Sequence, residues 1–204
     1  MFTPSQLVER IAIWLKNEQK ATRREIAVER ARAMAKVKSL YVLGAGGRDP
    51  KAKTPHTKRN ELVGSDCVGF TCWALQHDRY QPETFEIYDG WLNTDSIMMD
   101  ARGPQDWYAE VSRPEPGDVV VFPSIHRDGK RVRMGHIGLV VEAPDGMPEN
   151  VHRLAHDQRL LWLSRVKVID CAASSKRKPY AISETTAAAS WNKPDAMWAR
   201  CVRY

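Results

Sequence analysis

Apolar residues recur at intervals of three and four along the first forty residues, the spacing of one face of an amphipathic helix. The spacing predicts a helix from Ser5 to about Leu40, with a break in the polar stretch 17–24. Pro and Gly then become dense, and residues 44–65 are predicted to form a long loop. The apolar positions of the helix are Leu7, Val8, Ile11, Trp14, Leu15, Ile26, Ala33, Met34, Val37 and Leu40.

After residue 65 the chain changes from helical to strand-like patterns. Ser65 or Asp66 can cap a helix that runs to about His77, and residues 82–112 predict irregular structure with a short helical turn or two. Short apolar runs bounded by turn residues predict strands at 119–122, 137–141, 160–163, 166–170 and 198–202. Helices followed by an antiparallel sheet define an α+β fold.

Charge divides the chain into two unlike parts. Its 204 residues carry 31 Lys and Arg against 25 Asp and Glu, a net charge of +6. Residues 1–60 hold 14 basic and 5 acidic side chains, a net of +9, so the remaining residues sum to −3. This pattern is typical either of a solvated helix or of a segment that docks on an anionic surface.

The basic segment on its own favours a nucleic-acid or other polyanion-binding module. Phe2, Trp14 and Tyr41 are the only aromatic residues in that segment, too few for a stripe of stacking side chains between basic ones. We therefore regard nucleic acid as an unlikely partner, and the basic segment as a docking element at most.

No run approaches the 18 apolar residues that a membrane span needs, and residues 11–15 are too short for the apolar part of a signal peptide. We expect a protein that is cytoplasmic as synthesised. A phage particle, a specialised secretion apparatus or lysis would each be a route to a substrate outside the cell, and action inside the cytoplasm is a further alternative. The four cysteines form no CxxC pair and are expected to be reduced.

Two weak motifs do not indicate a site. The glycines at 44, 46 and 47 do not continue to a dinucleotide fingerprint, because Asp49 stands where its third glycine would be. His152 and His156 have the spacing of metal ligands on a helix, but Arg153 replaces the Glu of the HExxH motif.

Cys67 carries the stronger signal. It lies just inside a predicted helix start, where unpaired backbone N–H groups and the positive end of the helix dipole favour a thiolate. Cys67 is therefore a candidate nucleophile, whereas Cys72 falls in the apolar stripe and is expected in the core.

A thiolate needs a base and a group that orients the base. His136 begins an apolar strand between Gly135 and Gly138, which we expect to leave room for a substrate. Asp170 interrupts a second apolar run and is expected to face His136 across the sheet, since a buried carboxylate needs a partner.

Four segments together resemble the NlpC-type cell-wall cysteine peptidases of the papain-like superfamily. They are residues 41–47, the Asp-Cys-Val-Gly-Phe sequence at 66–70, the strands at 116–122 and 135–138, and residues 168–170. The resemblance divides the chain into a basic helical segment, 1–40, and a papain-like catalytic domain, 41–204, with an insertion around 76–112. It implies a helical N-terminal half, with the nucleophile at a helix N-terminus packed on an antiparallel sheet.

By this resemblance, Cys67 attacks a peptide bond of a peptidoglycan stem peptide, His136 is the base and Asp170 orients the imidazole. His is commoner than Asp at the third position, and His152 is a distant substitute for Asp170. Tyr41 and Asp66 would bind substrate, with no cofactor or metal required.

Val68 replaces a Ser that commonly follows the nucleophile and contacts the stem peptide, so stem-peptide specificity stays open. An acyltransferase, or an amidase on another substrate, is the alternative within the superfamily. Peptidoglycan or muropeptides are the expected substrate, and residues 1–60 a possible contact to the anionic wall.

Overall fold

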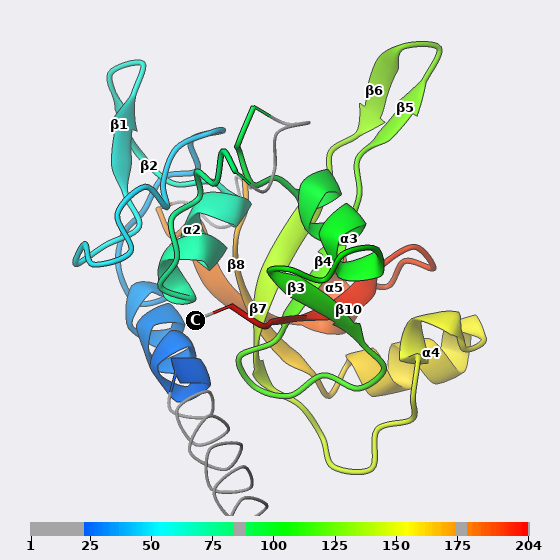
Figure 1. The fold of residues 1–204 in the computed structure, drawn as a ribbon. Coiled ribbons are helices and arrows are strands. Elements are labelled where there is room, and N and C mark those ends of the chain that lie inside the picture. Colours follow the sequence, from blue (N-terminus) through cyan, green and yellow to red (C-terminus); the bar gives the residue numbers. More distant parts are fainter. Residues whose placement is uncertain (1–22, 84–88, 174–178, 204) are drawn as a thin grey trace, which may run out of the picture.

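The computed structural model describes residues 23–83, 89–173 and 179–203, shown in colour in Figure 1. A six-stranded antiparallel sheet forms its centre, with strand order β3-β10-β4-β7-β8-β9. The strands are β3 (Tyr108–Val111), β4 (Val119–Phe122), β7 (His136–Glu142), β8 (Lys167–Cys171), β9 (Ile182–Thr186) and β10 (Met197–Cys201).

Two short hairpins project from the same end of the molecule in Figure 1. One pairs β1 (Thr57–Arg59) with β2 (Leu62–Gly64), and the other pairs β5 (Ile125–Arg127) with β6 (Lys130–Arg133). Their tips turn through residues with positive φ, Asn60 and Glu61 in the first hairpin and Asp128 and Gly129 in the second.

The alternation of side chains along each strand builds a core on both faces of the sheet. Val119 and Val121 of β4 face the helix α2 (Cys67–Ala74) and the N-terminal helix, whose described part covers residues 23–34. Val120 and Phe122 face the opposite way, toward α4 (His156–Leu163) and α5 (Ala187–Ser190). Because both faces are covered, β4 is fully apolar rather than alternating.

The remaining helices connect these layers. Helix α3 (Thr94–Arg102) packs beside β3 and β4 and begins with a reciprocal capping box between Asn93 and Ser96. A short 3₁₀ helix, η2 (Val151–Arg153), precedes α4. Among the helices described, none is long and apolar enough to cross a membrane.

The α+β prediction is confirmed, as are the predicted strands at β4, β7, β8 and β10 to within a residue at their ends. The strand predicted at 160–163 is wrong, because these residues form the last turn of α4. A four-residue apolar run has no period of its own, and here only Leu163 is buried while Leu161 faces solvent.

Of the predicted helix 5–40, residues 5–22 lie outside the described part of the chain. The predicted C-terminal end at residue 40 is wrong. The helix ends at 34, after which Ser39 and Tyr41 form isolated β-bridges to Tyr180 and Ser65. Irregular structure was expected over 82–112, a stretch that holds α3 and β3, and the loop expected at 44–65 holds the β1–β2 hairpin. The proposed domain boundary at residue 40 stays a prediction, although Ala27, Ala31 and Met34 contribute to the core that α2 shares.

Candidate active site

Cys67 is the first residue of α2, and the sequence around it explains why the helix begins there. Asp66 adopts extended backbone and caps the helix by accepting a hydrogen bond from Gly69 N at 2.8 Å. The backbone N–H of Cys67 is among the first four of the helix, which no intrahelical carbonyl can reach. Cys67 therefore lies at the positive end of α2, and only a small fraction of the residue is exposed.

Asp66 is anchored by the buried side chain of Arg79. The guanidinium makes a bidentate pair, with Nη1 2.8 Å from Oδ1 and Nη2 2.9 Å from Oδ2. Gly44 N also donates to Oδ2 at 2.7 Å. Arg79 further donates to the carbonyl oxygens of Ala45 and Leu92. Each Asp66 oxygen accepts two hydrogen bonds, so this network fixes the start of α2.

His136 and Asp170 come from adjacent strands of the sheet. Nε2 of His136 lies 2.6 Å from Oδ2 of Asp170, whose side chain has no exposed surface. Cys67 is the second group that raises the pKa of this imidazole, and because Nε2 faces Asp170, Nδ1 is the nitrogen left for the sulfur. The structure thus brings the three residues that the sequence singled out close to one another.

This environment favours the protonated imidazole. Burial lowers the pKa of His136, but the hydrogen bonds to Asp170 and Cys67 and their negative charges outweigh burial and raise it from 6.5 to about 10. An imidazolium held between a carboxylate and a sulfur stabilises negative charge on the sulfur. The arrangement is suited to a thiolate–imidazolium pair.

The indole ring of Trp191 covers one face of the His136 imidazole. The two rings are stacked, with centroids 5.4 Å apart and planes at 18°. A Cβ at Gly138 would lie 2.7 Å from the Trp191 ring, and one at Gly135 would lie 1.9 Å from Thr94 Oγ1. The expectation that these glycines leave room for a substrate is therefore wrong for Gly138, whose space the Trp191 ring fills, whereas Gly135 lines the cavity at Cys67.

A cavity of about 340 Å³ is lined by Cys67 and offers a route to it for a substrate. Tyr41, Asp66 and Arg79 also line this cavity, together with residues from the start of α3 and from the β5–β6 hairpin. Burial and the nearby Cys67 and Asp66 raise the pKa of Tyr41 above its ordinary value, so its hydroxyl is a stable hydrogen-bond donor. Both residues predicted to bind substrate thus line the cavity.

The other histidines of the sequence analysis lie elsewhere. His152 is buried against the ring of Trp198, with centroids 4.6 Å apart, and burial lowers its pKa to about 4. His156 is exposed and bonds Asp157 at 3.1 Å. Across the described ranges, no group of three or more His, Cys, Asp or Glu side chains is arranged to hold a metal ion.

Arg79 and Trp191 are the site residues that sequence reasoning missed. Arg79 lies in a stretch without periodicity, and Trp191 is 55 residues beyond His136, so neither carries a local signal. A clue existed in Gly138, since a glycine inside an apolar strand often marks the close approach of another group.

An antiparallel sheet, a cysteine at the start of a packed helix and a histidine–carboxylate pair on adjacent strands are the features of a papain-like α+β fold. Comparison with protein families agrees: the family model of the CHAP domain matches residues 56–153. Residues 56–153 are thus similar to the CHAP domain, a papain-like cysteine peptidase or amidase domain found in cell-wall hydrolases. The match includes Cys67 and His136 and ends before Asp170. No curated protein matches the chain.

Proposed function

We propose that this protein hydrolyses an amide bond in the peptide part of peptidoglycan, with Cys67 as nucleophile. The CHAP match supports a cysteine peptidase or amidase that acts on the cell wall. The observation that carries the proposal is the placement of His136, hydrogen-bonded to Asp170, next to Cys67, which lines a cavity of about 340 Å³. The narrower NlpC-type endopeptidase assignment stays a prediction.

In the proposed reaction, the Cys67 thiolate attacks the carbonyl carbon of the substrate amide. The backbone N–H of Cys67 is placed to donate to the oxyanion, an interaction whose removal in other enzymes costs about 3 kcal/mol. His136 then gives its proton to the leaving amine, and the C–N bond breaks to leave a thioester on Cys67. His136 next takes a proton from water, whose oxygen attacks the thioester and releases the acid and the thiolate.

Asp170 and Asp66 have supporting roles in this scheme. Asp170 keeps the imidazole ring in the orientation that points Nδ1 at the sulfur and stabilises its positive charge. Asp66 and Arg79 hold the first turn of α2, which sets the positions of both the sulfur and the proposed oxyanion donor. Tyr41 is positioned in the cavity wall to donate a hydrogen bond to substrate.

The test is digestion of purified peptidoglycan and soluble muropeptides, with products identified by mass. The wild-type protein should release pairs of products that together carry one added water, and Cys67→Ala should release none. Cys72→Ala is the matched control, because Cys72 lies on the same helix but is fully buried in the core. Equal product from Cys67→Ala and wild type would reject the nucleophile assignment.

The acyltransferase alternative differs in the fate of the thioester. Added amine, such as glycinamide, would then appear in the product in place of water. A wild-type reaction that yields mainly the amine adduct at low amine concentration would favour transfer over hydrolysis.

A further inference from the structure

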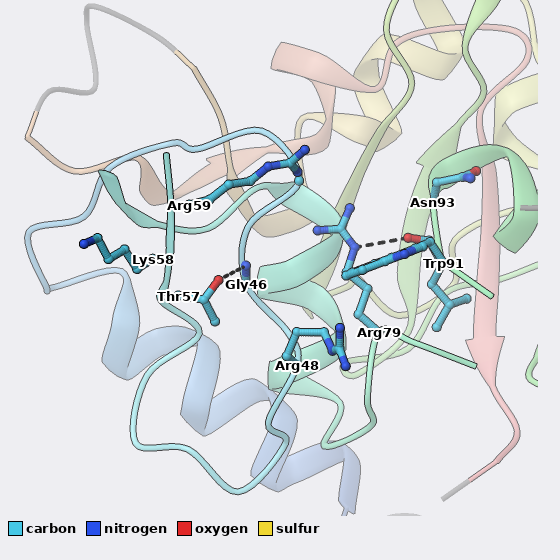
Figure 2. A pocket seen from close by; sticks show the side chains of 10 residues that line it. Gly46, Arg48, Thr57, Lys58, Arg59, Arg79, Trp91 and Asn93 are labelled. Atoms are coloured by element: carbon cyan, nitrogen blue, oxygen red, sulfur yellow. Dashed lines mark hydrogen bonds between the residues drawn. The ribbon is translucent and has the colours of Figure 1, made fainter. Parts of the chain in front are cut away.

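A second cavity, of about 570 Å³, lies beside the one at Cys67 (Figure 2). Both cavities are lined by Arg79 and Asn93, so they meet at these two residues. The second cavity is formed by the glycine-rich segment 44–48, strand β1 and residues 91–93. Nothing in the proposed chemistry at Cys67 uses it.

The lining of this cavity is strongly basic. Arg48, Lys58, Arg59 and Arg79 all contribute to its wall, and none of the described residues that line it is acidic. Figure 2 shows these four side chains distributed around the glycine-rich segment rather than gathered at one point. An electropositive cavity of this kind concentrates anions.

Some of this charge is already balanced. Asp66 pairs with Arg79 in a buried, bidentate arrangement, while Glu61 lies 2.9 Å from Lys58 and Asp78 lies 3.6 Å from Arg48. The last two pairs are exposed, and such pairs are worth less than about 1 kcal/mol, so a ligand can displace them.

Arg59 is different from the other three cations. In the part of the chain that the structure describes, no carboxylate lies within ion-pair distance of its guanidinium. A Cβ at Gly44 would fall 1.3 Å from Arg59 Nη1, so the guanidinium occupies space that exists because residue 44 has no side chain. Gly44 has a φ of +75°, a conformation that other residues rarely adopt. The backbone is thus shaped to admit this guanidinium.

Aromatic rings contact two of the arginines that line this cavity. Arg48 lies over the ring of Trp91, 5.1 Å from its centroid, and Arg79 lies 5.7 Å from the same centroid. Tyr80 packs on Trp91 with centroids 5.6 Å apart and also contacts Arg48. These contacts orient guanidinium groups before a ligand arrives, which lowers the entropy cost of binding.

We propose that this basic cavity is a subsite for a carboxylate group of the substrate, next to the amide that is cleaved. The inference rests on the proposed function, because a peptide substrate seated at Cys67 reaches the subsite by passing Arg79. Peptides carry carboxylates at their C-terminus and on acidic side chains, and a guanidinium binds a carboxylate through two parallel hydrogen bonds. The subsite selects substrates with a free carboxylate near the scissile amide over amidated ones.

The experiment uses the full chain with Cys67→Ala, so that binding is measured without turnover. Two synthetic stem-peptide fragments that differ only in one group, carboxylate or carboxamide, are titrated by calorimetry. The acid should bind about 10-fold more tightly than the amide, the difference that one charge-assisted hydrogen bond provides. Arg59→Gln should reduce the difference to less than about 2-fold.

Arg113→Gln is the matched control. Arg113 is exposed, pairs with Glu149 at 3.7 Å and lines neither of the two cavities. The Arg113→Gln substitution removes the same single positive charge from the protein, and the variant should keep the preference for the acid. Equal affinity for acid and amide, or an equal loss of preference in Arg59→Gln and Arg113→Gln, would overturn the subsite.

Turnover of the same two fragments by the wild-type protein separates the two proposals. Cleavage of both without a difference in kcat/KM retains the hydrolase and overturns the subsite. Selective binding of the acid without cleavage of either fragment supports the carboxylate subsite and counts against the hydrolase function.

Discussion

Trp191 and His136 are stacked ring against ring, with centroids 5.4 Å apart, although 55 positions separate them in the sequence. The indole is fully buried and packs against the bare backbone of Gly138. It therefore excludes water from one side of the His136–Asp170 hydrogen bond. In the lower dielectric that results, this bond is stronger than it would be in water.

Trp191→Leu should lower kcat about 10-fold, because water would reach the imidazole and its orientation would loosen. Trp191→Phe, which keeps a ring in the same place, should retain most of the activity. Trp162→Leu on α4 is the control, since Trp162 is only half-buried and contacts Arg165 rather than the site. Thermal unfolding measured in parallel separates lost stability from lost function. Unchanged kcat in a folded Trp191→Leu variant would refute a positioning role.

Asp170→Asn should reduce kcat on the order of 100-fold, since an amide neither carries the negative charge nor fixes the imidazolium as firmly. The pKa of His136 should also fall in this variant, because the hydrogen bond and charge of Asp170 are among the causes that raise it. NMR titration of the histidine ring protons measures this directly. Glu184→Gln on the neighbouring strand β9, where the side chain is exposed, should change neither quantity.

The raised pKa of His136 predicts a pH dependence of stability. The folded value of about 10 exceeds the ordinary 6.5, so protonation of His136 stabilises the fold fully below about pH 6.5, and this stabilisation is lost as the pH rises through about 10. Activity should fall over the same alkaline range, because the imidazolium is the proposed proton donor. Urea unfolding at several pH values measures the first effect.

Cys67→Ala provides the comparison for this pH dependence. It removes two of the causes that raise the pKa of His136, so the alkaline loss of stability should begin at lower pH. Identical stability profiles for the two proteins would show that Cys67 and His136 are not electrostatically coupled.

Arg79→Met should destabilise the protein by about 3–5 kcal/mol, because it leaves the Asp66 carboxylate buried without its partner. The double variant Asp66→Asn/Arg79→Met should recover part of this loss, since the Asn oxygen can still accept from Gly69 N. Arg102→Met breaks an exposed contact to Glu110 at 3.7 Å and should cost less than about 1 kcal/mol. Denaturant unfolding of the wild type and these three variants measures the free energies of unfolding. Equal losses of stability in Arg79→Met and Arg102→Met would contradict a structural role for the buried pair.

Local residue patterns were sufficient to place several features of this protein. They located the start of α2 at Ser65 or Asp66, strands β4, β7, β8 and β10, and the three residues that meet at the site. These are local signals: a cap, an apolar run between turn residues, and a polar residue where an apolar one is expected.

Tertiary structure alone decided what no local pattern encodes. Residues 160–163 form the end of helix α4, where Leu163 packs into the core. A run of four apolar residues has no period that would distinguish a helix from a strand. Arg79, Trp191 and the basic cavity arise from contacts between segments distant in the chain, such as Arg59 against Gly44 and Trp191 against Gly138. The chemistry of single residues can be inferred from sequence, but their partners depend on which surfaces the folded sheet brings together.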